Sequence, residues 1–347
     1  MLPSKLACSS LLLCALALAG CPNECPAPVG EPGPAAWEEI LGEEDLDGAI
    51  LSVWGAGPST VFIAGGPLGN PGRSAVAWRY DGCSWQDLSP GGADTFWWVS
   101  GSSATDVWFV GEKGRISHYD GQSMRDVPSG VTATIWGAIA FGPDDAWAVG
   151  GTPEAGANKP NDIVLRWDGT SWKPEALPGA PLGVSLFKVW GTSSDDLYVV
   201  GEQGTIWHRT ASGWATEPSG TDVRLFTVHG CGADDVFAVG GQSVLHRDAA
   251  GWSAVTNIEI GNLVNGVSCG PPGSAIVVGN GGLKQRLVDG TWIDDFSIEP
   301  YANFHSAWAD GEGAFWAVGG DFQTPAKDAR RLGVVARYGP TGVVRGR

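Results

Sequence analysis

The sequence has little of what helical or nucleic-acid-binding proteins contain. Only 2 of its 347 residues are Met, only 17% are charged, and no long stretch after residue 20 places hydrophobic residues at helical spacing. Its 21 Lys and Arg are outnumbered by 38 Asp and Glu, which gives a formal net charge of −17. A chain this acidic is not drawn to phosphate backbones, so nucleic acid is excluded as an expected partner.

Glycine and tryptophan are abundant instead, with 53 Gly and 18 Trp. The stretch from Ser185 to Gly220 contains four short apolar runs, rich in β-branched and aromatic residues and bounded by Gly, Ser or Asp. Such runs, with turn residues between them, are typical of β-strands. We therefore expect a four-stranded antiparallel meander here.

Copies of this unit fill the chain. The glycine that ends its second run, here called the repeat glycine, recurs at Gly65, Gly111, Gly150, Gly201, Gly240, Gly279 and Gly319. The spacings are 46, 39, 51, 39, 39 and 40 residues. Four strands per roughly 40 residues is the signature of a propeller blade. The sequence thus predicts an all-β fold, a seven-bladed β-propeller of four-stranded antiparallel blades.

The ring also needs closing, since an open blade edge is a liability. Residues Trp37 to Gly42, before the first unit, align with the fourth run of a blade. We expect them to supply the outer strand of the seventh blade. This strand should start on the face that carries the Asp-Gly turns between the third and fourth runs, such as Asp81-Gly82. The tail from Val343 to Arg347 is the rival for this place.

The N-terminus has the features of an export signal, with Lys5 before an apolar stretch. Leu18-Ala19-Gly20-Cys21 resembles the bacterial lipobox, which implies cleavage before Cys21 and lipidation of that residue; an ordinary signal peptide with a chance cysteine is the alternative. The domains are then a signal peptide (1–20), a lipidated Pro-rich tether (21–36) and the propeller (37–347). Pro22 follows the cysteine where an aspartate would signal inner-membrane retention, so we expect anchoring to the outer membrane.

Two sequence features, a turn and a pair of glycines, resemble those of known propellers. The turn Trp167-Asp168-Gly169-Thr170-Ser171-Trp172 is similar to a degenerate Asp-box of BNR and sialidase-like propellers. Paired glycines after the second run, as at Gly65-Gly66 and Gly240-Gly241, resemble kelch repeats. The whole resembles bacterial surface lipoproteins with such repeats. This implies the fold but not the function, because propellers host hydrolases, oxidases and binding modules alike. The arginine triad of sialidases has no counterpart at matching places.

Histidines and tryptophans give the channel candidates. His118, His208 and His246 take the same place in the third run of different blades, so they cannot converge on one metal ion and are expected to be structural. The first runs are expected to line the central channel; its candidates are Trp98, Lys188, His229 and His305. Because neighbouring residues of a strand point to opposite faces, only one of Trp97 and Trp98 is expected there.

Acidic residues precede the second runs, as in Asp195-Asp196 and at Asp106. We expect one aspartate at each such place to accept backbone N–H bonds and fix the turn. None has the spacing of a calcium-binding loop. We expect no metal site and no cofactor.

Loop length is unequal among the blades. Between the second and third runs, blades one, three and seven insert residues 66–75, 151–162 and 320–332, and all three insertions should emerge on one face, here called the insertion face. Such loops are where repeat proteins place binding surfaces; drift in a tolerant loop is the alternative. Candidate binding residues, which include a local positive spot in the last loop, are Asn70, Arg73, Glu154, Lys159, Asp162, Lys327, Arg330 and Arg331.

Four cysteines remain after the leader and the lipidated residue. They allow three disulfide pairings. We favour Cys231 with Cys269, in equivalent turns of adjacent blades, and Cys25 with Cys83, near the tether.

Together these features favour an exported, lipid-anchored, monomeric propeller that binds a protein or glycan of the cell envelope without catalysis. The first alternative is a glycan- or peptide-directed hydrolase at the channel mouth, for which Glu154 and Asp162 are available but form no catalytic constellation. The second is a scaffold that helps envelope assembly.

Overall fold

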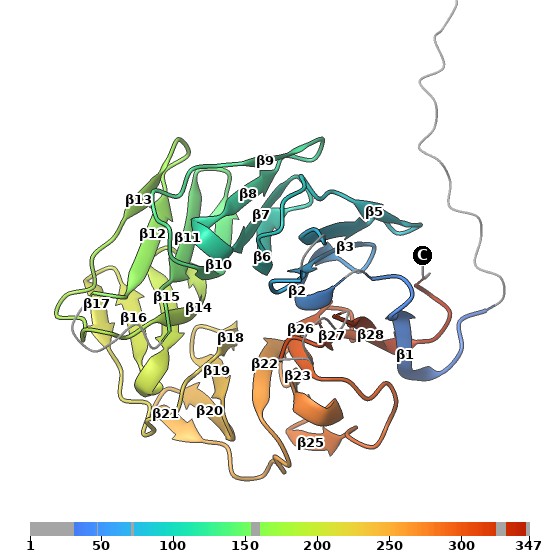
Figure 1. Ribbon diagram of the computed structural model, residues 1–347. Coiled ribbons are helices and arrows are strands. Elements are labelled where there is room, and N and C mark those ends of the chain that lie inside the picture. Colours follow the sequence, from blue (N-terminus) through green and yellow to red (C-terminus); the bar gives the residue numbers. More distant parts are fainter. Residues whose placement is uncertain (1–30, 47, 71–72, 154–159, 324–330, 345–347) are drawn as a thin grey trace, which may run out of the picture.

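The computed structural model describes residues 31–344 except 47, 71–72, 154–159 and 324–330. Its strands form seven four-stranded antiparallel sheets arranged as blades around one axis (Figure 1). This confirms the predicted seven-bladed propeller. Within the described ranges there is no helix long and apolar enough to cross a membrane.

Each blade runs outward from the axis. The innermost strands, which follow one another around the ring, are β2 (Ala49–Gly57), β6 (Phe96–Ser103), β10 (Ile135–Gly142), β14 (Leu186–Ser193), β18 (Thr227–Gly232), β22 (Val264–Cys269) and β26 (Phe304–Ala309). The second strands are β3 (Thr60–Gly66), β7 (Asp106–Gly111), β11 (Asp145–Gly150), β15 (Asp196–Gly201), β19 (Asp235–Gly240), β23 (Ala275–Gly279) and β27 (Phe315–Gly320).

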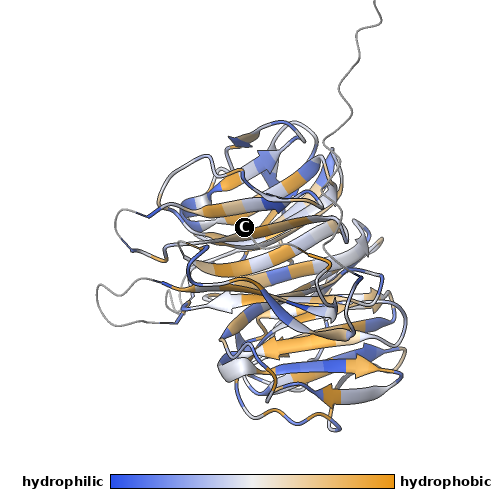
Figure 2. Ribbon diagram, turned by 90° about the vertical axis from the view of Figure 1, so that its right-hand side faces the viewer, coloured by the Kyte–Doolittle hydropathy of each residue, from blue (hydrophilic) through white to orange (hydrophobic). Residues whose placement is uncertain are grey.

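The outer strands are shorter than the inner ones in blades one to six, but not in blade seven. The third strands are β4 (Val76–Tyr80), β8 (Ile116–Tyr119), β12 (Ile163–Trp167), β16 (Ile206–Thr210), β20 (Ser243–Asp248), β24 (Lys284–Val288) and β28 (Gly333–Pro340). The outer strands are β5 (Trp85–Asp87), β9 (Met124–Asp126), β13 (Trp172–Pro174), β17 (Gly213–Thr216), β21 (Gly251–Ala254), β25 (Thr291–Asp294) and β1 (Ala35–Leu41). In Figure 2 most hydrophobic positions lie in the strands, whereas hydrophilic positions occur in the loops and also in parts of some strands.

A steric constraint explains why the repeat glycine recurs at this place in every blade. In every blade a Cβ on this glycine would overlap the carbonyl oxygen of the residue just before or at the start of the inner strand, such as Ser185 against Gly201 or Leu263 against Gly279. Only glycine lets the two backbones approach this closely. The sequence period therefore records a backbone contact that each blade repeats.

A second glycine explains the Trp-Gly pairs of the inner strands. The indole of Trp190 lies where a Cβ on Gly230 of the next blade would sit, and Trp54 lies in the same way against Gly101. The Trp of one blade thus packs on the Gly of the next, and aromatic area is buried between blades.

The strand-three histidines are structural, as expected. His118, His208 and His246 are hydrogen-bonded through Nε2 to aspartates at the start of the second strands, at 2.7, 2.9 and 2.7 Å. Each ring also packs on the aromatic residue beside it, for example His208 on Tyr198 with 4.1 Å between centroids.

The expected role of those aspartates was wrong. Asp106, Asp196 and Asp235 are hydrogen-bonded to side chains of their own blade, the strand-three histidines among them, and not to turn N–H groups. The Asp-Gly turns do the capping instead: Asp168, for example, accepts the N–H groups of Thr170 and Ser171 at 2.9 and 2.8 Å.

The N-terminal strand closes the ring, as predicted. β1 pairs with β28 as the outer strand of the seventh blade, and its first residue, Ala35, lies beside Pro340 on the face of the Asp-Gly turns. Trp37 Nε1 donates a hydrogen bond to Asp295 Oδ2 of blade six at 2.8 Å. This bond holds the closing strand against the neighbouring blade.

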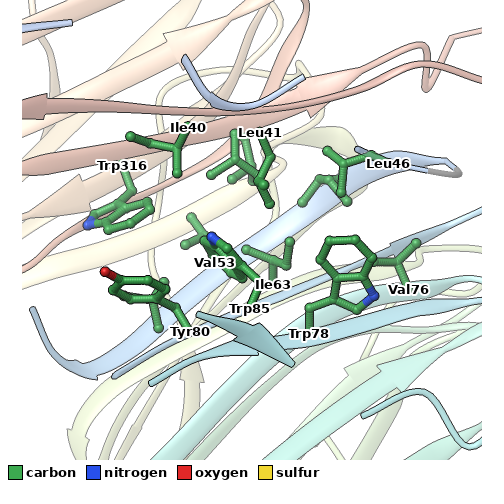
Figure 3. Packing of buried hydrophobic residues seen from close by; sticks show 14 residues of the cluster. Ile40, Leu41, Leu46, Val53, Ile63, Val76, Trp78, Tyr80, Trp85 and Trp316 are labelled. Atoms are coloured by element: carbon green, nitrogen blue, oxygen red, sulfur yellow. The ribbon is translucent and has the colours of Figure 1, made fainter. Parts of the chain in front are cut away.

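A buried cluster seals the seam between blades seven and one. Figure 3 shows Ile40 and Leu41 of the closing strand with Trp316 of β27, packed against side chains of the first blade. The first-blade residues in the cluster include Val53, Ile63, Val76, Trp78, Tyr80 and Trp85.

The contact at the repeat glycine can be tested by substitution. We expect Gly201→Ala to lower the free energy of unfolding by about 1–3 kcal/mol, because the new methyl would overlap the Ser185 carbonyl. The matched control is Gly232→Ala, whose Cβ would have nothing within 4 Å, and we expect a change within about 0.5 kcal/mol there. Urea unfolding followed by Trp fluorescence measures both, and equal losses at the two sites would contradict the steric explanation.

Candidate functional site

A β-bulge near the start of the inner strands builds the site. The pairing of β6 with β7 runs from Phe96–Gly111 to Trp98–Val110, so Trp97 is an extra residue. Corresponding shifts occur in β2, β10, β14, β22 and β26. A bulge disrupts the alternation of faces and re-aims a side chain. The residues at the equivalent place in the seven blades are Leu51, Trp97, Trp136, Phe187, Phe226, Asn265 and His305.

All of these except Leu51 line one cavity of about 290 Å³ at the channel mouth on the insertion face. We call this cavity the cup. Its aromatic side chains contact one another in sequence around the wall: Trp97–Trp136, Trp136–Phe187 and Phe187–Phe226, with centroids 4.6, 6.1 and 5.7 Å apart. The cup is therefore rigid and mostly apolar.

Two of the three long loops complete the wall. Pro153 comes from the loop of blade three, and Phe322 and Gln323 come from that of blade seven. Phe322 packs edge-on against His305 at 5.1 Å, and Trp136 Nε1 donates to the Gly151 carbonyl at 2.8 Å. The loops are thus bound to the same ring of residues that lines the cup.

Arg331 is the one residue of the expected positive spot that the structure describes. Its guanidinium donates to the carbonyls of Asp321, Gln323 and Leu68, so it braces its own loop and ties that loop to the loop of blade one. The guanidinium is therefore engaged in hydrogen bonds within the protein.

The other loop candidates that the structure describes do not line the cup. Asn70 and Arg73 lie in the loop of blade one, and Asp162 lies beside the start of β12. Six predicted residues fall outside the described residues: Cys21, Cys25, Glu154, Lys159, Lys327 and Arg330.

Lys188 forms part of the cup floor. It is 4% exposed, and its ammonium group lies 4.0 Å from the centroid of the Trp98 ring while donating to the Trp136 carbonyl at 2.7 Å. Burial lowers the pKa of Lys188 to about 7, since the apolar surroundings disfavour the charged form.

The Trp97-Trp98 pair departs from expectation. Because of the bulge, both residues face the channel: Trp97 lines the cup, and Trp98 lines a second cavity of about 280 Å³ further along the axis. Lys188 and Trp98 therefore lie between the two cavities.

The two inner-strand histidines are neutral. Burial, with a smaller contribution from the Lys188 charge, lowers the pKa of His305 to about 3. His305 Nδ1 is bonded to the Leu51 carbonyl at 2.5 Å. Burial lowers the pKa of His229 to about 4; this residue lines the second cavity, and its Nδ1 accepts the Cys269 N–H at 3.1 Å.

Cys231 and Cys269 form a disulfide between blades five and six, with their Cα atoms 5.0 Å apart. Cys83 is also disulfide-bonded, and its expected partner, Cys25, lies outside the described residues.

One polar cluster, on blade two, joins a hydroxyl, a carboxylate and an imidazole. Ser102 and His118 both bond to Asp106, so the imidazole does not activate the hydroxyl. In the described part of the chain, no three metal-ligating side chains are grouped to hold an ion.

Sequence reasoning missed Trp97, Trp136, Phe187 and Phe226 as a site. The sequence does contain a signal, because four consecutive blades each carry an aromatic residue at the same place near the start of the inner strand. That these residues converge follows only from the bulge.

Comparison with known proteins yields the fold alone. No protein-family model and no curated protein matches the sequence. Among solved structures, YCF48 bound to D1 peptide is similar, with a TM-score of 0.64 and 15% identity over 90% of this chain and 98% of that one. Virginiamycin B lyase from Staphylococcus aureus has a TM-score of 0.64 at 13% identity, covering 87% and 98% of the two chains. The WD40 β-propeller domain of Doa1 has a TM-score of 0.64 at 12% identity, covering 86% and 96%.

The Lys188 environment makes a prediction about pH. Because its pKa falls from 10.5 to about 7 on folding, the unfolded chain holds one more proton than the folded chain between these values, and stability should rise with pH there. Relative to Lys188→Met, the wild type should gain up to about 1.4 kcal/mol per pH unit between pH 7 and about 10. Urea unfolding of both proteins at several pH values measures this; a difference that stays constant would contradict it.

Proposed function

We propose that this chain is a non-catalytic binding module whose cup takes an apolar segment of a partner protein on the insertion face. The observation that carries the proposal is the cup itself. It is concave, lined mainly by aromatic side chains and held by contacts among them, which is the usual character of a ligand site. A preformed site also avoids much of the ordering entropy that binding otherwise costs.

The comparisons support a protein rather than a glycan partner. A solved propeller of similar fold is described as bound to a D1 peptide, although the low identity transfers no residue role. Aromatic rings form much of the cup wall, and its Asn265 and Arg224 side chains are already paired within the protein, whereas sugar recognition needs several hydrogen-bonding groups in fixed places. A peptide side chain with an aromatic or aliphatic body fits this lining better.

The test is capture from a native envelope extract by the full chain carrying Phe226→Ala, compared with wild type. Phe226 lines the cup, and truncating a central aromatic anchor should weaken capture about 10- to 100-fold. The matched control is Phe296→Ala, because Phe296 is 41% exposed on blade six and lies outside the cup. A partner captured equally by both variants, or no partner at all, would overturn the proposal.

We also propose that the chain is exported and anchored by lipid at Cys21, on the strength of the lipobox-like Leu18-Ala19-Gly20-Cys21. β1 starts on the face of the Asp-Gly turns, so an anchor preceding it would leave the insertion face turned away from the membrane.

Labelling of bacteria with radioactive palmitate tests the anchor. The wild type should incorporate the label and sediment with membranes, whereas Cys21→Ser should do neither, because the acylated thiol is gone. Label that persists in Cys21→Ser would show that another residue is modified and would contradict the assignment.

A further inference from the structure

The cup has hydrogen-bond donors without acceptors. The Lys188 ammonium carries three N–H groups, and the described residues supply one acceptor for them, the Trp136 carbonyl. The indole N–H of Trp97, on the same wall, is buried with no partner in the described part of the chain. Buried donors are normally paired, so the floor of the cup lacks an acceptor that a ligand can bring.

No acidic residue balances Lys188 within the described lining of the cup. None of the described residues that line the cup is Asp or Glu. The only other ionisable groups among those residues are His305, which is neutral, and Arg224, whose guanidinium is paired with Glu202 at 3.2 Å. The described lining of the cup is therefore positive or neutral in charge.

The fold does not require a lysine at this place. The residue that follows the bulge pairs with the residue before the repeat glycine in every blade. Its identities around the ring are Ser52, Trp98, Gly137, Lys188, Thr227, Gly266 and Ser306. The other six are neutral, and features that all blades share are structural, so the single cation is a feature of this site and not of the propeller.

Resting on the proposed function, we infer that the cup recognises a carboxylate carried on an apolar residue, with Lys188 binding the carboxylate and the aromatic wall holding the apolar part. The cavity of about 290 Å³ has room for one or two side chains. The carboxylate is either the free C-terminus of a peptide or an acidic side chain next to an apolar residue. A charge-assisted hydrogen bond in such a water-poor place is stronger than a neutral one.

Small probes separate the carboxylate from the apolar contribution. N-acetylphenylalanine and N-acetylphenylalaninamide share a ring and differ in charge, and N-acetylaspartylphenylalaninamide carries only a side-chain carboxylate. In ligand-observed NMR titrations of the full chain at pH 6, we expect the first to bind about 10-fold more tightly than the amide. The third shows whether a side-chain carboxylate serves equally.

Two variants assign the effect to one residue. Lys188→Met keeps the length and apolar stem, and it should bind the acid and the amide equally. Lys113→Met is the matched control, since Lys113 is an exposed lysine in the tight turn of blade two, paired with Asp94, and it should keep the preference of the wild type. Circular dichroism checks that both variants are folded.

The preference should also depend on pH. In the ligand-free protein the ammonium group of Lys188 loses its charge near pH 7. The affinity for the acid should therefore fall above that pH, while the affinity for the amide stays constant. His305 stays neutral over this range, so it does not produce the change.

The outcomes are distinct. Equal binding of acid and amide by the wild type would overturn the carboxylate inference and leave the apolar cup as a binding site. A preference that survives in Lys188→Met would assign the charge effect elsewhere and overturn it too. If no probe binds, the inference fails, and the capture experiment with Phe226→Ala then decides separately whether the cup binds a protein.

Discussion

The structure depends on one close backbone contact, made once in each blade, between the repeat glycine and the carbonyl at the start of the inner strand. This contact brings the second strand against the bulged start of the first. The bulge in turn sets a side chain over the channel mouth. The same local geometry therefore produces the sequence period, the approach of the strands and the ring of residues that lines the cup.

Much of the fold was readable from the sequence for this reason. A glycine that no other residue can replace leaves a regular pattern, so the sequence predicts the seven blades, and with them the closing strand at Trp37. The cup is not predicted, because strand alternation assigns Trp97 and Trp98 to opposite faces and a bulge has no mark of its own in the sequence. Arg331 misled for a related reason: composition shows a charge, but only the folded loop shows that backbone carbonyls surround it.

Comparing the blades with one another separates structure from function. The repeat glycines, the Trp-Gly contacts and the paired His and Asp residues recur in several blades, and each has a packing or hydrogen-bonding role where it occurs. No other blade has a lysine at the position of Lys188. Burying this side chain costs free energy. In a protein made of repeats, the exceptions to the repeat are where a specific activity is expected to reside.

The closing strand has a consequence for how the ring forms. Blades one to six each pair strands that are close in sequence, so they can assemble locally and quickly. Blade seven must join Ala35–Leu41 to Gly333–Pro340, at opposite ends of the described chain. Closing so long a loop is entropically slow. During synthesis the first strand to emerge is thus the last to find its place, and until then the nascent ring is an open arc with an unpaired edge.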